Sequence, residues 1–270
     1  MFAVKSMGKR KDWNINVMND EEKTQKQIAN DLTALGVREG GVILVHASLR
    51  SLGPVAGGAE TVVRGLLHAL GKNGTLLMPA LSYQSVGISN PVFDLQKTPS
   101  CVGVLPEYFR TRPGSVRSVH PTHSVSGLGR EVGRLLKDHH LDTTPCGPHS
   151  PFYGLREIKG QVLFLGCGMR PNTSMHAIEE IAEPPYLFGD PIDYRIVLAE
   201  GKEIKMRVIR HRFAGWRQRY DRLSLLLDAD GLKRGKVLEA TCDLIDCELM
   251  WEQAIIALKK DPFFFVEMIQ

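Results

Sequence analysis

The residues best suited to chemistry lie in a segment that begins as an apolar run and continues as a predicted helix. His176 and Glu179 stand three positions apart, so a helix places them on one face. A carboxylate beside an imidazole can fix the ring's orientation and support its protonated form, as in general base catalysis by histidine. A nearby helix N-terminus would instead favour the neutral ring that accepts a proton. The spacing fits equally a histidine on the helix surface or packed in the core.

A second candidate is the HPTHS motif, in which His120 and His123 flank a Pro-Thr pair. Arg112 and Arg117 precede the motif. Guanidinium groups and a histidine are well suited to holding phosphates, so the motif predicts an anion pocket. Solvated loop charges are an equally good interpretation.

Two weaker signals involve glycine and cysteine. Gly57 and Gly58 precede a predicted helix and could bring backbone N–H groups against a phosphate. They match neither a GxGxxG nor a Walker pattern, so an ordinary tight turn is the simpler interpretation. Cys167 shares a loop with His176, and a Cys–His nucleophilic pair is conceivable. A small buried residue at a strand end explains the cysteine as well.

Short apolar segments that read as strands precede these candidates. Residues 42–45 and 75–78 predict two strands joined by a helix over 60–70, which together have the length of a βαβ unit. Residues 162–165 predict a further buried strand that ends at the loop before His176. Ligands of open α/β sheets bind beyond the carboxyl ends of the strands, which is where the candidate residues fall.

The N-terminal segment and the C-terminal third predict elements outside the strand–helix–strand pattern of the middle of the chain. Asn19 and Asp20 are good first residues for a helix that runs to about Leu35. Residues 193–209 predict an antiparallel hairpin with Gly201 in its turn, and 216–227 and 247–259 predict helices. We therefore expect an α/β fold with a mixed central β-sheet flanked by helices, and with an antiparallel hairpin and helices in the C-terminal third.

Composition limits the class of protein. Hydrophobic residues are 43% and charged residues 24% of the 270, which is ordinary globular composition. The net charge of +4 is too balanced for nucleic acid, although it suits an anionic cofactor. No apolar run approaches the roughly 20 residues of a membrane span, and the polar N-terminus is no secretory signal. The five cysteines lack CxxC spacing and read as reduced thiols. We expect a cytoplasmic protein without a metal, with a lead-in over 1–18 and one domain over 19–270.

Several motifs occur together and in one order along the chain. The most specific are HPTHS, then GPHSPF, then NTSMHAIE, which ends at Glu179. With VHASLRSLGPVAGG, GTLLMPALSY and RGKVLEA they resemble the aminoglycoside 3-N-acetyltransferase family, which is distinct from the GNAT fold. The resemblance implies a mixed-sheet α/β acyltransferase that moves acetyl from acetyl-CoA to an amine. It assigns the role of base to His176.

The same resemblance implies roles for particular residues. His176 would take a proton from the acceptor amine while Glu179 orients the ring. The expected contacts of acetyl-CoA are His46, Ser48, Leu49, Arg50, Gly57, Gly58, Arg117, Ser118, His120, His123 and Ser124. The expected contacts of the acceptor are Tyr83, Asp94, Asn172 and Asp221. The acceptor would be the 3-amino group of the 2-deoxystreptamine ring of an aminoglycoside, whose acetylation confers resistance. We expect a monomer or homodimer.

One departure from the family pattern concerns the acceptor. Many relatives carry an acidic residue six positions before the catalytic histidine, where this sequence has Arg170. Arginine can neither support the histidine nor attract a cationic amine, so Glu179 or a residue of the C-terminal third must supply the carboxylate. Three alternatives stay open: acetyl transfer to a non-aminoglycoside amine, a Cys167–His176 thiol hydrolase, and a non-catalytic CoA-binding protein.

Overall fold

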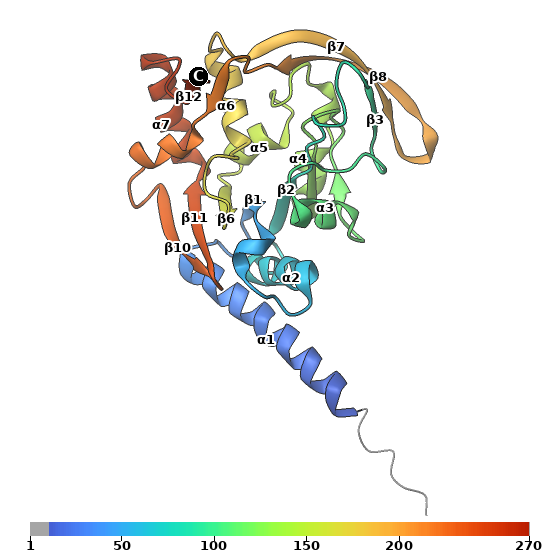
Figure 1. The fold of residues 1–270 in the computed structure, drawn as a ribbon, viewed down its shortest axis with the longest axis vertical. Helices are drawn as coiled ribbons and strands as arrows, with labels where there is room; N and C mark the ends of the chain where they lie inside the picture. Colours follow the sequence, from blue (N-terminus) through green and yellow to red (C-terminus); the bar gives the residue numbers. More distant parts are fainter. Residues whose placement is uncertain (1–10, 270) are drawn as a thin grey trace, which may run out of the picture.

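The centre of the fold is a seven-stranded sheet with the strand order β10-β11-β6-β1-β2-β5-β4 (Figure 1). The structure is a computed structural model that describes residues 11–269, with side chains from residue 20. Three adjacent strands are mutually parallel: β6 (Gln161–Leu165), β1 (Val42–Ala47) and β2 (Thr75–Pro79). Antiparallel strands extend both edges: β11 (Ala240–Asp246), β10 (Leu232–Val237), β5 (Val125–Gly129) and β4 (Val116–Arg117). The sheet is mixed, as predicted.

Helices cover both faces of this sheet because its central strands are apolar on both sides. In β1, Ile43 and Val45 pack into one core, whereas Val42 and Leu44 pack into the other. One face carries α1 (Lys11–Leu35), α2 (Gly58–Leu70) and α3 (Val104–Thr111). The other face carries α4 (Val132–Leu136), α5 (Pro151–Glu157), α6 (Ser174–Ala182) and α7 (Cys247–Lys260).

The helix ends follow local rules of the sequence. α1 ends at Leu35 as predicted, because Gly36 takes a φ of 105° that favours glycine. It begins at Lys11 rather than at Asn19, so residues 11–18 of the expected lead-in are helical, and residues 1–10 lie outside the described part. α7 also agrees with its prediction, and the Asp246 carboxylate accepts hydrogen bonds from the first backbone N–H groups of that helix.

The predicted hairpin is confirmed and forms part of a smaller sheet. β7 (Phe188–Val197) and β8 (Glu203–His211) pair antiparallel around the turn η3 (Ala199–Gly201). β3 (Val92–Asp94) joins them in parallel with β7, which gives a three-stranded sheet. The two long strands arch over the upper part of the molecule in Figure 1.

The helix predicted over 216–227 is wrong. Its first residues form β9 (Trp216–Gln218), which pairs with β12 (Val266–Met268), and η4 (Tyr220–Leu225) follows. Pairing with a strand about 50 positions away, together with the packing of Trp216 on Phe263, overrides the local helical preference. The other short helices are η1 (Leu49–Leu52) and η2 (His139–Leu141). None of the helices over 11–269 combines the length and apolarity needed to cross a bilayer.

Candidate active site

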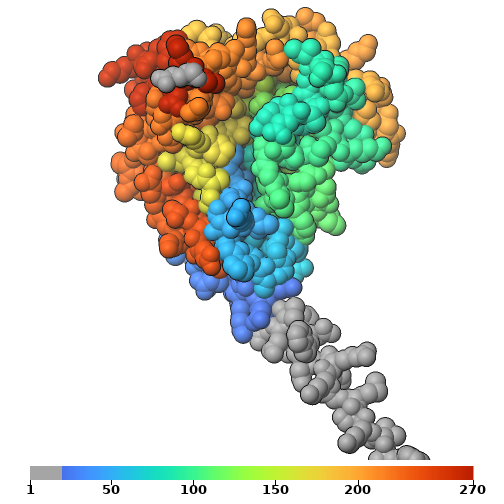
Figure 2. Space-filling view, viewed as in Figure 1, coloured from blue at the N-terminus to red at the C-terminus, as the bar shows by residue number. Residues whose placement is uncertain are grey.

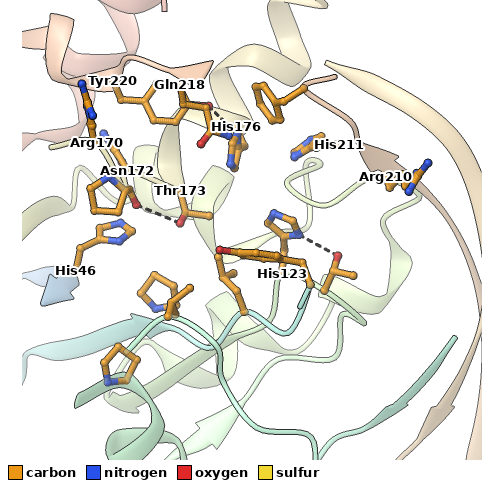
Figure 3. A pocket seen from close by; sticks show the side chains of 18 of the residues that line it. His46, His123, Arg170, Asn172, Thr173, His176, Arg210, His211, Gln218 and Tyr220 are labelled. Atoms are coloured by element: carbon orange, nitrogen blue, oxygen red, sulfur yellow. Dashed lines mark hydrogen bonds between the residues drawn. The ribbon is translucent and has the colours of Figure 1, made fainter. Parts of the chain in front are cut away.

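A cavity of about 620 Å³ opens where the three parallel strands end (Figure 3). β1 contributes His46 and Ala47 to its wall, and β2 contributes Pro79. The loop after β6 and the start of α6 supply further residues, from Cys167 to His176, and the small sheet supplies His211. Figure 2 shows the surface hollowed between the green and yellow parts of the chain. The cavity therefore lies at the sheet edge where α/β proteins bind ligands.

The wall holds His176, which is paired with Glu179. The Nδ1 atom of His176 lies 3.0 Å from Oε2 of Glu179, and the Glu179 side chain is completely buried. An ionised carboxylate can only accept hydrogen bonds, so Nδ1 carries the proton and donates it. The Nε2 atom of the neutral ring is then left with a lone pair. This geometry is that of a general base with an orienting carboxylate.

Two tyrosines complete the surroundings of this carboxylate. The Tyr220 hydroxyl donates to Oε2 of Glu179 at 2.7 Å and lies 3.0 Å from Nδ1 of His176. The Tyr186 hydroxyl donates to Oε1 at 2.8 Å. Burial raises the pKa of Tyr220 and of Tyr186 above the usual range, so both hydroxyls stay protonated. Glu179 thus receives three donors, and the sequence offered no local signal for either tyrosine.

A second histidine–carboxylate pair adjoins the first. Nε2 of His211 lies 2.8 Å from Oε1 of Glu180, and the two side chains are almost wholly buried. Glu180 also accepts hydrogen bonds from the Thr144 hydroxyl at 2.6 Å and from the Cys146 backbone N–H at 2.7 Å. Burial raises the pKa of Glu180 to about 7 and lowers the pKa of His211 well below its usual range. This pair was not predicted from the sequence, because no motif near His211 indicates a site.

Some of the other predicted residues reach the cavity wall. They are His46, His123, Tyr83 and Asn172. The His46 ring stacks on Phe164 with ring centroids 5.2 Å apart, and Nδ1 of His123 lies 2.9 Å from the Thr122 hydroxyl. These four residues line the same cavity as His176 and come from four different segments of the chain.

Apart from Thr122, which also lines the cavity, the predicted residues near His123 lie behind the wall. The buried Arg117 guanidinium donates to the carbonyl oxygens of Ala80 and Thr98 and to the Ser124 hydroxyl. Nδ1 of His120 accepts hydrogen bonds from the backbone N–H groups of Thr122 and His123, which fixes the turn that presents His123.

Two further side chains of this region are also engaged within the protein. The Ser118 hydroxyl lies 2.9 Å from Nδ1 of His139, and Arg112 forms an ion pair with Glu60 at 2.8 Å. The HPTHS region therefore supports the wall from behind, and neither arginine is placed to form the predicted anion pocket.

The other expected contacts of acetyl-CoA are not among the residues that line the cavity. They are Ser48, Leu49, Arg50, Gly57 and Gly58. They follow the carboxyl end of β1, through η1 and into the start of α2, where Gly57 has a φ of 73° and no side chain caps the helix. A helix N-terminus of this kind suits phosphate groups.

The two acidic residues expected at the acceptor are engaged elsewhere. Oδ1 of Asp94 accepts hydrogen bonds from the backbone N–H groups of Gln96 and Lys97. Asp221 forms ion pairs with Arg219 at 2.9 Å and with Arg170 at 3.6 Å. Neither carboxylate lines the cavity, whereas Arg170 does.

Cys167 lines the cavity but is not prepared for nucleophilic attack. Burial raises the pKa of its thiol to about 12, so the reactive thiolate is scarce at neutral pH. Among the described hydrogen bonds none joins this thiol to an imidazole. The thiol-hydrolase alternative therefore loses its support.

The chain matches the family model of the aminoglycoside 3-N-acetyltransferases over residues 44–259. It belongs to that family. Aminoglycoside N(3)-acetyltransferase IV from a Salmonella species is 32% identical over 248 residues, which are 91% of each chain. Aminoglycoside N(3)-acetyltransferase VII from Streptomyces paromomycinus is 35% identical over 184 residues, which are 62% of this chain and 64% of that protein.

Solved structures of family members share the fold. A mutant of the aminoglycoside acetyltransferase AAC(3)-IVa in complex with gentamicin has a TM-score of 0.77 and 32% identity, covering 89% of this chain and 90% of that one. The binary complex of AAC-IIIb with CoASH has a TM-score of 0.76 and 27% identity, covering 87% and 96%. The expected mixed α/β fold and the acyltransferase class are thereby confirmed.

Proposed function

We propose that this family member transfers the acetyl group of acetyl-CoA to the 3-amino group of the 2-deoxystreptamine ring of an aminoglycoside, with His176 as the general base. The enzyme is an acyltransferase, and its cosubstrate is acetyl-CoA. The observation that carries the assignment of the base is the pairing of the cavity-lining His176 with the buried Glu179. Glu179 supplies the carboxylate that orients His176, a role that Arg170 cannot perform.

In the proposed reaction His176 carries the proton and Glu179 supports its imidazole ring. Nε2 of His176 takes a proton from the neutral acceptor amine as its nitrogen attacks. The amine nitrogen forms a bond to the thioester carbonyl carbon, the carbon–sulfur bond breaks, and the proton on Nε2 can pass to the departing thiolate. The Glu179 carboxylate stabilises the imidazolium formed in between. Tyr220 and Tyr186 hold that carboxylate in place, so the base needs little reorganisation during reaction.

The two substrates would approach His176 from different sides. We place acetyl-CoA along the carboxyl end of β1, with Ser48, Gly57 and Gly58 beside its phosphates and pantetheine. The acceptor would lie against Tyr83 and Asn172, which line the cavity. We further propose that the enzyme acts in the cytoplasm, as a monomer or a homodimer, where acetyl-CoA is supplied.

The direct test of this function is release of CoA thiol in the presence of gentamicin, kanamycin or tobramycin. The acetylated product is then located by NMR and mass spectrometry. We expect turnover with at least one compound and acetylation of the 3-amino group. A protein that binds acetyl-CoA but acetylates none of these compounds would contradict the proposed acceptor. Expression in a susceptible strain should raise resistance to the same compounds.

One observation favours a second acceptor class, an amine with few positive charges or with an acidic group. Among the described residues that line the cavity, none is Asp or Glu, whereas Arg170 and Arg210 are present. Polycationic aminoglycosides gain from carboxylates, and guanidinium groups favour phosphate or carboxylate. Glucosamine and glucosamine 6-phosphate form a matched pair of acceptors. A higher kcat/KM for the phosphate, lost in Arg170→Gln, would support this class; preference for gentamicin over both would exclude it.

A further inference from the structure

We propose that His123, His176 and His211 form a binding site for a divalent transition metal of the Zn²⁺ type, and that a metal bound there blocks acetyl transfer. One nitrogen from each ring lies within 4.8 Å of a nitrogen from each of the other two. The centroids of the His176 and His211 rings are 4.8 Å apart, and that of His123 lies 5.8 and 5.4 Å from them. Figure 3 shows the three rings together at the cavity. The metal is an inhibitor in this proposal, so acetyl-CoA remains the only cosubstrate.

Each ring has one nitrogen fixed by the protein and one left over. Nδ1 of His176 faces Glu179, Nδ1 of His123 faces the Thr122 hydroxyl, and Nε2 of His211 faces Glu180. Histidines that bind metals commonly have this second contact, which sets the ring's orientation and its tautomer. The three nitrogens available to a metal are therefore Nε2 of His176, Nε2 of His123 and Nδ1 of His211.

The free nitrogen of His211 is the independent sign of a missing partner. Its Nδ1 atom is buried and has no hydrogen-bond partner. The His211 side chain is only 4% exposed, so bulk water does not satisfy this nitrogen either. A metal ion held between the three rings would satisfy it.

The size and chemistry of the site select the kind of metal. Zn–N bonds of about 2.0–2.1 Å in a tetrahedral site imply nitrogens about 3.3 Å apart, so the rings must rotate inward from their present separation. Three imidazoles favour Zn²⁺, Cu²⁺ or Ni²⁺ over Mg²⁺ and Ca²⁺, which prefer oxygen. The fourth position faces the cavity and is open to water.

The functional consequence rests on the proposed role of His176. A metal bound to Nε2 uses the lone pair that would accept the proton of the amine. The metal-bound protein should therefore bind acetyl-CoA yet fail to transfer acetyl. Binding of the metal itself does not depend on this role, so the two can be tested separately.

The experiment starts from full-length protein freed of metal by chelation. Zn²⁺ is titrated against a chromophoric chelator, and Co²⁺ is added separately to record the visible spectrum. We expect one Zn²⁺ per chain and the intense Co²⁺ bands of four-coordinate geometry. His211→Gln should weaken Zn²⁺ binding at least tenfold, and Glu180→Gln should weaken it about 10- to 100-fold. His46→Gln, which changes a cavity histidine outside the trio, should bind Zn²⁺ as the wild type does.

Three results would overturn the proposal: no Zn²⁺ retained against the chelator, equal affinity in His211→Gln and wild type, or a six-coordinate Co²⁺ spectrum. Thermal unfolding checks that each variant is folded. If His211→Gln is not folded, the Zn²⁺ affinity of Glu180→Gln and the Co²⁺ spectrum of the wild type decide whether the site exists.

One equivalent of Zn²⁺ should lower the rate of acetyl transfer at least tenfold, and adding the chelator should restore it. Full activity with Zn²⁺ bound would overturn the inhibitory role, whereas absence of acetyl transfer without Zn²⁺ would count against the proposed function alone.

Discussion

Replacing Glu179 by glutamine tests the carboxylate behind the base at nearly constant volume. The carboxylate accepts hydrogen bonds from His176, Tyr220 and Tyr186, and it is completely buried. A glutamine amide offers one accepting oxygen and one donating NH₂ group. If the oxygen faces His176, the ring keeps its tautomer but loses the charge that stabilises the imidazolium. If the NH₂ group faces the ring, it donates to Nδ1 and moves the ring proton to Nε2, where it blocks the base.

The size of the effect follows from these two outcomes. General base catalysis contributes about 10²- to 10⁴-fold, and an equivalent change behind the histidine of a serine protease costs about 10⁴-fold. We therefore expect kcat/KM of Glu179→Gln to fall by about 10²- to 10⁴-fold, or about 2.7–5.4 kcal/mol of transition-state stabilisation.

The assay is CoA thiol release at saturating acetyl-CoA and varied acceptor, together with the CoA dissociation constant and the melting temperature. Glu183→Gln is the matched control, because Glu183 lies just after α6 and is exposed. The control should retain wild-type kinetics. A Glu179→Gln enzyme that keeps kcat/KM within about threefold would refute the reasoning, since one pKa unit of interaction already corresponds to tenfold.

Tyr220→Phe removes one hydroxyl donor to Glu179 and should lower kcat about 10- to 100-fold with unchanged CoA affinity, because a hydrogen bond to a charged group contributes about 1.5–3 kcal/mol. Cys167→Ser should keep wild-type turnover, and iodoacetamide should label the wild-type thiol slowly at pH 7, because burial raises its pKa to about 12. Burial lowers the pKa of His139 to about 4. Between about pH 6.5 and 4, this histidine is therefore protonated in the unfolded chain but neutral in the folded protein. The free energy of unfolding should therefore fall as the pH is lowered from 6.5 toward 4, and His139 should account for about 2 kcal/mol of the loss between pH 6.5 and 5. In urea unfolding, His139→Gln should lack this part of the pH dependence. Arg170→Asp should raise kcat/KM for gentamicin several-fold, because it replaces a cation on the cavity wall with the charge that polyamines prefer; a lower value would show that Arg170 assists this acceptor.

The parts of the fold that the sequence predicted depend on local patterns. The apolar runs of β1, β2 and β6, the hairpin around Gly201 and the three-residue spacing of His176 and Glu179 all involve near neighbours in the chain. Periodicity and spacing carry this information directly. The rule for open α/β sheets likewise predicted a site at the carboxyl ends of the strands, where the cavity lies.

The missed parts depend on contacts between distant segments. Tyr220 reaches Glu179 across 41 positions, and His211 reaches Glu180 across 31. Nothing near either residue marks it as part of a site, and Tyr220 follows a segment whose helical preference was overridden by strand pairing. For Arg117 the sequence predicted a site where the structure has none. Its charge suggested an anion pocket, but three carbonyl oxygens and one hydroxyl in the interior accept its hydrogen bonds.

The central claim is that Nε2 of His176 accepts the proton of the attacking amine. The most direct measurement compares His176→Ala with the wild type in CoA thiol release and in CoA binding by calorimetry on the same preparations. If His176 is the base, turnover should fall by about 10²- to 10⁴-fold while the CoA dissociation constant changes less than about twofold. Unchanged turnover in His176→Ala would contradict the central claim.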